Sequence, residues 1–198
     1  MTSGLDLVLE HRVDFEKARD RLLELLKEKS FRKGKVVLRS GKESDFYIDC
    51  KQTSLSAEGH LLIAKLFHHV VRKNFKKVCA VGGPTLGADP LVSAVATWSA
   101  LNNDPLDAFI IRKGAKGHGT GQAIEGLANV KKGCPVVVME DVVTTGGSTL
   151  RSISRCREAG LNVEGVVALV DRCEGGRQSI EQEGIKLYSL YSREDFLG

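Results

Sequence analysis

The stretch that most constrains the fold runs from Val136 to Leu150 and reads VVVMEDVVTTGGSTL. It begins with a nearly continuous run of apolar residues, which is typical of a parallel strand covered on both faces. Two acids, Glu140 and Asp141, end that run, and a polar, glycine-rich turn then leads to an amphipathic helix predicted over 150–159. Backbone amides in such a turn and the dipole of the following helix favour a bound phosphate. The pattern therefore predicts a phosphate-binding loop with two carboxylates beside it.

The rest of the chain repeats this alternation of strand and helix. Strands are predicted over 78–81, 106–111, 163–170 and 185–190, and helices over 57–73, 91–101 and 176–183. Alternation of this kind predicts a parallel sheet with helices on both faces, because each connection must cross back over the sheet. A length of 198 residues suits one such α/β domain.

The first 50 residues depart from that pattern. A stripe of leucines within 14–29 predicts an amphipathic helix with Asp14 as its N-cap and an end near Gly34. Residues 35–50 then read as two strands joined by a polar turn. We therefore expect this part of the chain to form a helix and a small hood lobe over an α/β core made by residues 51–198.

Charge and cysteine content narrow the classes of function. The net charge of +4, from 29 basic and 25 acidic residues, suits anionic small molecules and does not indicate nucleic acid. The five cysteines are scattered and never in C-x-x-C spacing, so we expect reduced thiols in a cytoplasmic protein, with neither a zinc site nor a disulfide framework. No run approaches the roughly 20 apolar residues that a membrane-spanning helix needs, so no membrane is expected.

Three further loops follow predicted strands, at the edge of the sheet where ligands gather in α/β folds. Gly82 to Thr85 could face a second phosphate, or could be only a tight turn. The segment 112–123 is rich in glycine and cations, which is typical of a lid over an anion, although a solvated surface loop has the same composition. Arg172 could meet an anionic substrate group, but an arginine at a strand end is often a surface ion-pair residue.

Residues 136–149 resemble the phosphoribosyl diphosphate (PRPP) signature of the type I phosphoribosyltransferases. Within that family the chain is similar to the orotate phosphoribosyltransferases, over about residues 30–190. Their motifs are matched by Arg39-Ser40-Gly41-Lys42-x-Ser44-x-x-Tyr47-x-Asp49, by Arg112-Lys113-x-x-Lys116-x-His118-Gly119 with Ile124-Glu125-Gly126, and by Val170-Asp171-Arg172. The chain departs from the family pattern at Thr85-Leu86, where Tyr-Lys is common, at Arg39, where lysine is usual, and at Ile48, where an aromatic residue is usual.

The resemblance implies a type I phosphoribosyltransferase fold and a site for PRPP and orotate. Residues implied to bind PRPP are Arg39, Gly82, Gly83, Pro84, Thr85, Arg112, Lys113, Lys116, His118, Glu140, Asp141, Thr144, Thr145, Gly146, Gly147 and Ser148. Tyr47, Thr144 and Arg172 are implied to bind orotate, and Lys116, His118 and Asp141 to be catalytic. Mg²⁺ is implied as the cofactor, held mainly through PRPP and water near Glu140 and Asp141.

The implied reaction is attack by a ring nitrogen of orotate on the anomeric carbon of PRPP, which gives orotidine 5′-monophosphate and diphosphate. The resemblance also implies a homodimer in which the loop 112–123 acts in the partner's site. Two alternatives stay open at this point. One is a phosphoribosyltransferase for another base, because the 136–149 signature identifies PRPP and says little about the acceptor. The other is a PRPP-sensing regulator that keeps the fold and binds nucleic acid.

Overall fold

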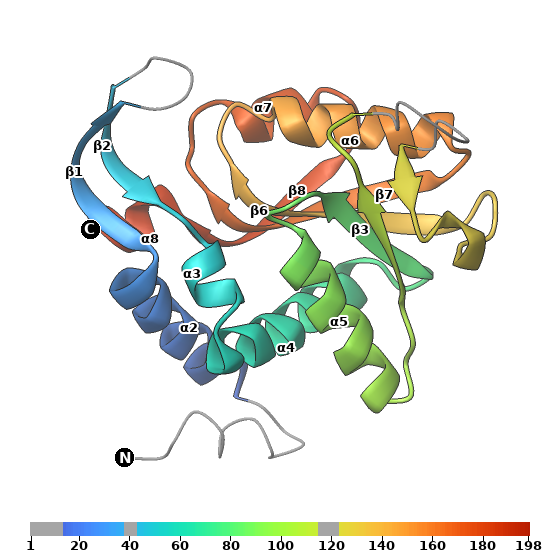
Figure 1. Ribbon diagram of the computed structural model, residues 1–198, viewed down its shortest axis with the longest axis horizontal. Coiled ribbons are helices and arrows are strands. Elements are labelled where there is room, and N and C mark those ends of the chain that lie inside the picture. Colours follow the sequence, from blue (N-terminus) through green and yellow to red (C-terminus); the bar gives the residue numbers. More distant parts are fainter. Residues whose placement is uncertain (1–13, 38–42, 115–122) are drawn as a thin grey trace.

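The structure is a computed structural model, and it describes residues 14–37, 43–114 and 123–198 (Figure 1). Within these residues the central sheet has six strands in the order β5-β4-β3-β6-β7-β8. Its strands are β3 (Ala80–Pro84), β4 (Asp107–Ile111), β5 (Ile124–Glu125), β6 (Pro135–Val143), β7 (Asn162–Asp171) and β8 (Lys186–Ser192). All neighbours pair in parallel except β4 and β5, which are antiparallel. The predicted α/β class with a central, mostly parallel sheet is confirmed, and the antiparallel edge strand is an addition to it.

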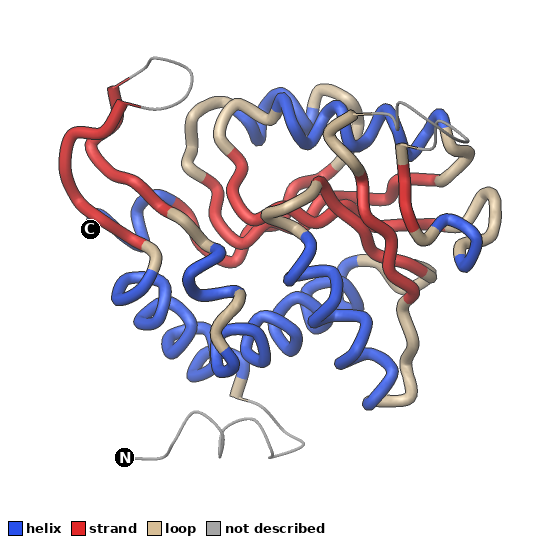
Figure 2. Tube along the Cα trace, in the orientation of Figure 1, coloured by secondary structure: helices blue, strands red, loops and turns tan. Residues whose placement is uncertain are grey.

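Helices cover both faces of the sheet, as Figure 2 shows. On one face lie α2 (Phe15–Lys29), α4 (Ala57–Asn74) and α5 (Asp89–Leu101), and on the other lie α6 (Gly147–Glu158) and α7 (Gly176–Glu181). Because successive side chains of a strand point to opposite faces, Val137 and Met139 of β6 join the core under α4, whereas Val138 joins the core under α6. A 3₁₀ turn, η1 (Leu127–Asn129), and a final helix, α8 (Arg193–Leu197), complete these elements.

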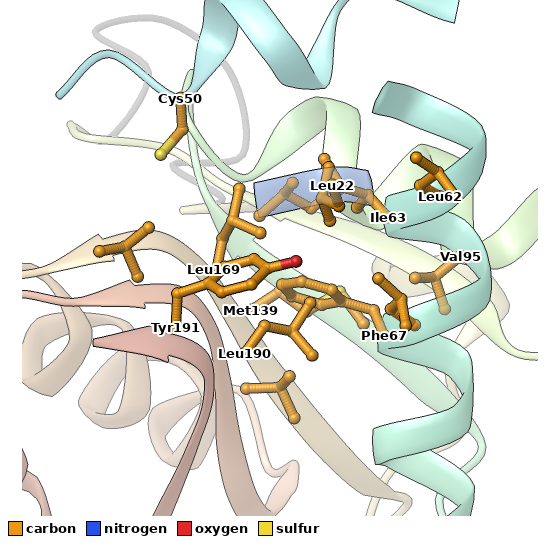
Figure 3. Close-up of a cluster of buried hydrophobic side chains, with 14 of the residues drawn as sticks. Leu22, Cys50, Leu62, Ile63, Phe67, Val95, Met139, Leu169, Leu190 and Tyr191 are labelled. Atoms are coloured by element: carbon orange, nitrogen blue, oxygen red, sulfur yellow. The ribbon is translucent and has the colours of Figure 1, made fainter. Parts of the chain in front are cut away.

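The larger core is built from elements far apart in the sequence. Figure 3 shows Leu22 of α2, Phe67 of α4, Met139 of β6 and Tyr191 of β8 packed together, and all four are at most 1% exposed. Burial of such side chains is the main stabilising contribution to the fold. The Tyr191 hydroxyl also donates a 2.6 Å hydrogen bond to the carbonyl of Arg19. The N-terminal helix is therefore fixed to the last strand of the sheet.

A hairpin stands apart from the main sheet at the predicted hood (Figure 1). It consists of β1 (Phe31–Val37) and β2 (Glu43–Ile48), which pair antiparallel, and the short helix α3 (Lys51–Ser54) links it to the core. The predicted end of the first helix near Gly34 was wrong, because α2 ends at Lys29 with Ser30 as its C-cap. Phe31 leaves the helix to pair with Ile48 and to stack on Phe196, with ring centroids 5.4 Å apart.

Two other predicted boundaries were also wrong, and both errors concern the site. Gly82 and Gly83 belong to β3 and do not form a loop after it. A Cβ on Gly82 would lie 2.2 Å from the ring of Phe109, and one on Gly83 would lie 2.3 Å from the carbonyl of Met139, so close packing requires glycine at both positions. The second error is in β6, which continues to Val143, so that the two acids lie within the strand.

The expectation of reduced thiols throughout needs a correction at one pair of cysteines. The structure joins Cys79 to Cys134, with Cα atoms 6.4 Å apart, which is within the range that disulfides span. The two residues come together because β3 and β6 are parallel neighbours, in which Ala80 pairs with Val136. Their separation of 55 residues in the sequence conceals this proximity. Cys50, Cys156 and Cys173 are free thiols.

Candidate active site

The turn between β6 and α6 has the backbone geometry of the predicted phosphate loop. Gly146 is the N-cap of α6 and has a φ of 83°, in the left-handed region that favours glycine. The cap makes no side-chain hydrogen bond, and the first turn of α6 contains no acid. Backbone amides at the start of a helix have no partner within the helix, so this turn can offer them to a phosphate. The helix begins at Gly147, three residues before the predicted start at Leu150, and Ser148 therefore lies in its first turn.

A second glycine, Gly176, supports this loop from the start of α7 and was missed in the sequence. Its amide donates a 3.0 Å hydrogen bond to the carbonyl of Thr144. A Cβ at Gly176 would lie 2.5 Å from that same carbonyl and 2.9 Å from the amide of Gly146. The two loops therefore touch backbone to backbone, and only glycine fits between them. The available signal was the Gly175-Gly176 pair, which closely follows Arg172.

Glu140 lies on the α6 face of β6, beside the phosphate loop. Its Oε2 accepts hydrogen bonds from the Thr149 hydroxyl at 2.8 Å and from the Ser148 hydroxyl at 3.3 Å. The residue is 5% exposed. Burial raises its pKa to about 8, although the hydrogen bond from Thr149 opposes that rise. Glu140 is thus mainly protonated at neutral pH until a cation or a donor group of a ligand favours the carboxylate.

Asp141 projects from the opposite face of β6. Its Oδ1 accepts a 2.9 Å hydrogen bond from the amide of Val142, and its carboxyl group lies against Gly87 in the loop after β3. Burial raises the pKa of Asp141, while the Val142 amide and the positive charge of Lys51 oppose that rise. The prediction placed both acids at the ribose, and the structure has them as consecutive residues near the carboxyl end of β6, with their side chains on opposite faces of the strand. Gly87 and Lys51 had not been predicted as site residues.

The two acids suit a hard divalent cation. Mg²⁺ prefers oxygen ligands and commonly takes only one or two carboxylates, while phosphates and water supply the rest. Glu140 is buried and Asp141 is half-buried, and desolvation raises the pKa of both acids, so a nearby cation would favour their ionised forms. Glu140 and Asp141 therefore fit the implied Mg²⁺ in number and chemistry.

Arg172 reaches from the end of β7 toward the hood. Its amide donates to the carbonyl of Val143 at 2.9 Å, and its Nε donates to Glu174 at 2.9 Å. The guanidinium lies 4.3 Å from the centre of the Phe46 ring, which is a cation–π arrangement. At 4% exposure Arg172 is not the surface ion-pair residue that was the alternative interpretation.

Tyr47, which the prediction places at the orotate site together with this arginine, lies on β2 of the hood. It neighbours Phe46 in β2, so its side chain projects from the other face of the hairpin, where it is 43% exposed. The role of Tyr47 in binding orotate stays a prediction.

The base of the predicted lid lies at the β4–β5 edge of the sheet. A cavity of about 500 Å³ is lined there by Thr85, Arg112, Lys113 and Glu125, among others. Arg112 donates to Glu125 at 2.9 Å, and its carbonyl accepts a hydrogen bond from Arg155 of α6. The predicted lid cations therefore begin beside Thr85, as a diphosphate site would require. Arg39, Lys116 and His118 lie outside the described residues.

Comparison with known proteins finds relatives that are named orotate phosphoribosyltransferase. No family model matches the chain. A protein from Sorangium cellulosum named orotate phosphoribosyltransferase is 46% identical over 179 residues, which cover 90% of this chain and 93% of that protein. One from Aquifex aeolicus with the same name is 46% identical over 182 residues, covering 90% of this chain and 97% of that protein. The crystal structure of orotate phosphoribosyltransferase from Mycobacterium tuberculosis in complex with PRPP matches with a TM-score of 0.74 and 33% identity, over 90% of this chain and 98% of that chain.

Proposed function

Since the chain belongs to the orotate phosphoribosyltransferase family, we propose that its site transfers the phosphoribosyl group of PRPP to orotate. The products are orotidine 5′-monophosphate and diphosphate, which places the reaction in the de novo synthesis of UMP. The observation that carries the proposal is the end of β6. There a loop of glycines and hydroxyl residues that includes Gly146 adjoins the buried Glu140 and the half-buried Asp141.

PRPP would lie across this end of the sheet. The 5′-phosphate binds the amides and hydroxyls of 144–148, where the dipole of α6 favours negative charge. Glu140 and Asp141 then lie where the ribose hydroxyls follow the phosphate. Gly82 to Thr85, at the end of the neighbouring strand β3, face the diphosphate. Close packing of Gly82 on Phe109 and of Gly83 on Met139 fixes the backbone that leads to Thr85.

The reaction breaks the bond between the anomeric carbon and the diphosphate oxygen while a ring nitrogen of orotate attacks that carbon. Positive charge grows on the ribose and negative charge grows on the leaving diphosphate. The positive charge on the ribose is stabilised by the ionised forms of Asp141 and Glu140. The negative charge on the diphosphate is stabilised by the cations of the 112–123 segment, which are Arg112, Lys113, Lys116 and His118. Preorganised charges in a dry site are worth more than the same charges in water. His118 or Lys116 can also give a proton to the departing diphosphate.

Mg²⁺, when bound with PRPP, neutralises part of the diphosphate charge. Glu140 and Asp141 would hold it mainly through water. Their contribution as protein groups is to become ionised in its presence, because burial alone keeps the pKa of each acid high.

Orotate would be held between β7 and the hood. Arg172 supplies a buried cation for the orotate carboxylate, and Thr144 lies next to it because their backbones meet at the ends of β6 and β7. Tyr47 would border the base from the hairpin. A carboxylate on the base fits a buried arginine, whereas uracil, adenine and hypoxanthine carry no such charge, so this arginine favours orotate over another base.

The functional unit would be a homodimer in the cytoplasm, with the 112–123 segment of one protomer acting over the site of its partner. In its support, the described base of this segment lies at the edge strand of the sheet, beside Thr85. In the part of the chain that the structure describes, no helix combines the length and the apolar character needed to cross a membrane.

The decisive experiment measures diphosphate release from PRPP in the presence of Mg²⁺ and one base at a time. We expect turnover with orotate and none with uracil, adenine or hypoxanthine. Turnover with one of those bases would show that the acceptor is not orotate, while PRPP would remain the donor. Salt-dependent DNA binding without any turnover would instead support a PRPP-sensing regulator.

A further inference from the structure

The segment 49–51, where the hood meets α3, lies against the backbone of Asp141. The Sγ of Cys50 is fully buried and lies 3.9 Å from the carbonyl oxygen of Asp141. Figure 1 shows α3 between the hairpin and the end of β6. The helix packs on α2, α4 and α5, so this turn is fixed by the core. The residue that follows Cys50 is therefore held near Asp141.

That residue is Lys51. Its Nζ lies 2.5 Å from Oδ1 of Asp49, and the side chain is 41% exposed. The same Asp49 carboxylate also accepts from the Lys51 amide at 3.2 Å and from the Gln52 side chain at 3.3 Å. Asp49 would thus keep two hydrogen-bond donors if the ammonium left it. The ion pair is partly exposed, and pairs of that kind contribute little stability.

Lys51 follows Cys50, whose Sγ contacts the Asp141 carbonyl, and it therefore lies near the predicted PRPP site. Its charge acts on Asp141, and the Asp141 carboxyl group lies against Gly87, in the loop that follows the diphosphate-facing end of β3. In that loop Leu86 is 67% exposed and carries no charge. Arg112 lines a cavity together with Thr85, at the start of that loop, but its guanidinium is already paired with Glu125. Lys51 could therefore bind a diphosphate here, because Asp49 keeps the Lys51 amide and Gln52 as hydrogen-bond donors when the ammonium leaves.

We propose that Lys51 is a substrate-binding residue whose ammonium moves from Asp49 to the diphosphate of PRPP. The inference rests on the proposed function for the identity of the ligand. A lysine can make this move because its ammonium lies at the end of a flexible chain of four carbons. Asp49 then has a defined part, since it holds the ammonium in place before the substrate binds and competes with the diphosphate for it.

The test compares Lys51→Ala, Lys51→Arg and Asp49→Asn with the unchanged protein, and uses Lys76→Ala, an exposed lysine distant from the site, as the matched control. Binding of PRPP without orotate, and of inorganic diphosphate, is measured by titration calorimetry with Mg²⁺ present. We expect Lys51→Ala to weaken both roughly tenfold or more, with Lys51→Arg restoring most of the loss. Asp49→Asn should have the opposite sign and tighten both, because it removes the competing carboxylate.

The opposite signs separate a binding role from a structural one. If Lys51 only held Asp49 in the fold, the two substitutions would act alike, and that result would overturn the proposal. A loss confined to the KM for orotate, with unchanged diphosphate binding, would also overturn it. Because calorimetry needs no turnover, a protein that binds diphosphate through Lys51 but does not use orotate would refute the proposed function and leave this inference standing.

Discussion

The carboxyl group of Asp141 lies so close to Gly87 that a Cβ there would be 2.3 Å from Oδ2 and 2.5 Å from Oδ1. Real Cβ atoms do not approach other atoms so closely, so the carboxyl group of β6 occupies space that glycine alone leaves open. The loop after β3 and the acid of β6 are thereby linked, although they are far apart in the sequence.

Gly87→Ala should therefore displace the Asp141 carboxylate and raise the KM for PRPP roughly tenfold, while the thermal unfolding temperature changes little. Steady-state kinetics with varied PRPP measures this. The control is a double-mutant cycle with Asp141→Ala, in which the methyl group has no carboxylate to displace, and the cycle is read by titration calorimetry of PRPP without Mg²⁺ because Asp141 variants are expected to be inactive. If Gly87→Ala is as harmful in the Asp141→Ala background, the effect does not pass through Asp141.

Arg172 and Arg193 both lie over the ring of Phe46, at 4.3 Å and 5.6 Å from its centre, but only Arg172 is buried at the end of β7. Arg172→Ala should raise the KM for orotate roughly tenfold or more, because a buried charge-assisted contact to the carboxylate is lost. Arg193→Ala removes a comparable ring contact outside the site and should change that KM by less than about twofold.

Arg172→Lys tests the same contact with the charge retained. It should recover only part of the affinity, since an ammonium lacks the planar, two-point geometry of guanidinium. A similar rise in KM for PRPP and for orotate in Arg172→Ala would contradict a specific role at the base and would indicate a general disturbance of the site.

The lid residue Lys116 can be tested although its position lies outside the described residues. Lys116→Ala should lower turnover by orders of magnitude without unfolding the chain, and Asp141→Asn should lose Mg²⁺-dependent PRPP binding. If the lid acts across a dimer, mixing the two inactive variants restores roughly a quarter of the sites, because half of the dimers are mixed and each has one intact site. Mixtures that stay inactive after subunit exchange would show that the lid serves its own protomer.

The sequence predicts the order of the elements because apolar periodicity and turn residues are local properties. For the same reason, the strand, acid and glycine pattern of 136–149 is enough to indicate the phosphate loop and both carboxylates. Boundaries failed where tertiary packing decides them. Gly82 and Gly83 look like a loop in isolation, yet they are strand residues against Phe109 and Met139.

Other site features could not be predicted because they join residues that are distant in the chain. Cys79 meets Cys134 only through the parallel pairing of β3 with β6. The role of Gly176 depends on its hydrogen bond to the carbonyl of Thr144, which belongs to another loop. Lys51 reads as an ordinary lysine until the fold brings its turn against Asp141.

The last prediction concerns the buried acid Glu140, whose pKa is raised from 4.5 to about 8 in the folded chain. Between these two pH values the unfolded chain has an ionised Glu140 while the folded chain keeps it protonated, so this residue lowers stability progressively as pH rises through that window. Glu140→Gln keeps an acceptor for Thr149 but cannot ionise. Urea unfolding should therefore find the variant equal to the unchanged protein near pH 4.5 and more stable near pH 8, by on the order of a few kcal/mol. The comparison near pH 4.5 is the internal control, because the acid is then largely protonated in the folded chain and its pH-dependent penalty is almost absent. If Glu140→Gln is more stable by the same amount at both pH values, the effect comes from packing. If the variant is less stable near pH 8, the folded chain holds Glu140 as a carboxylate.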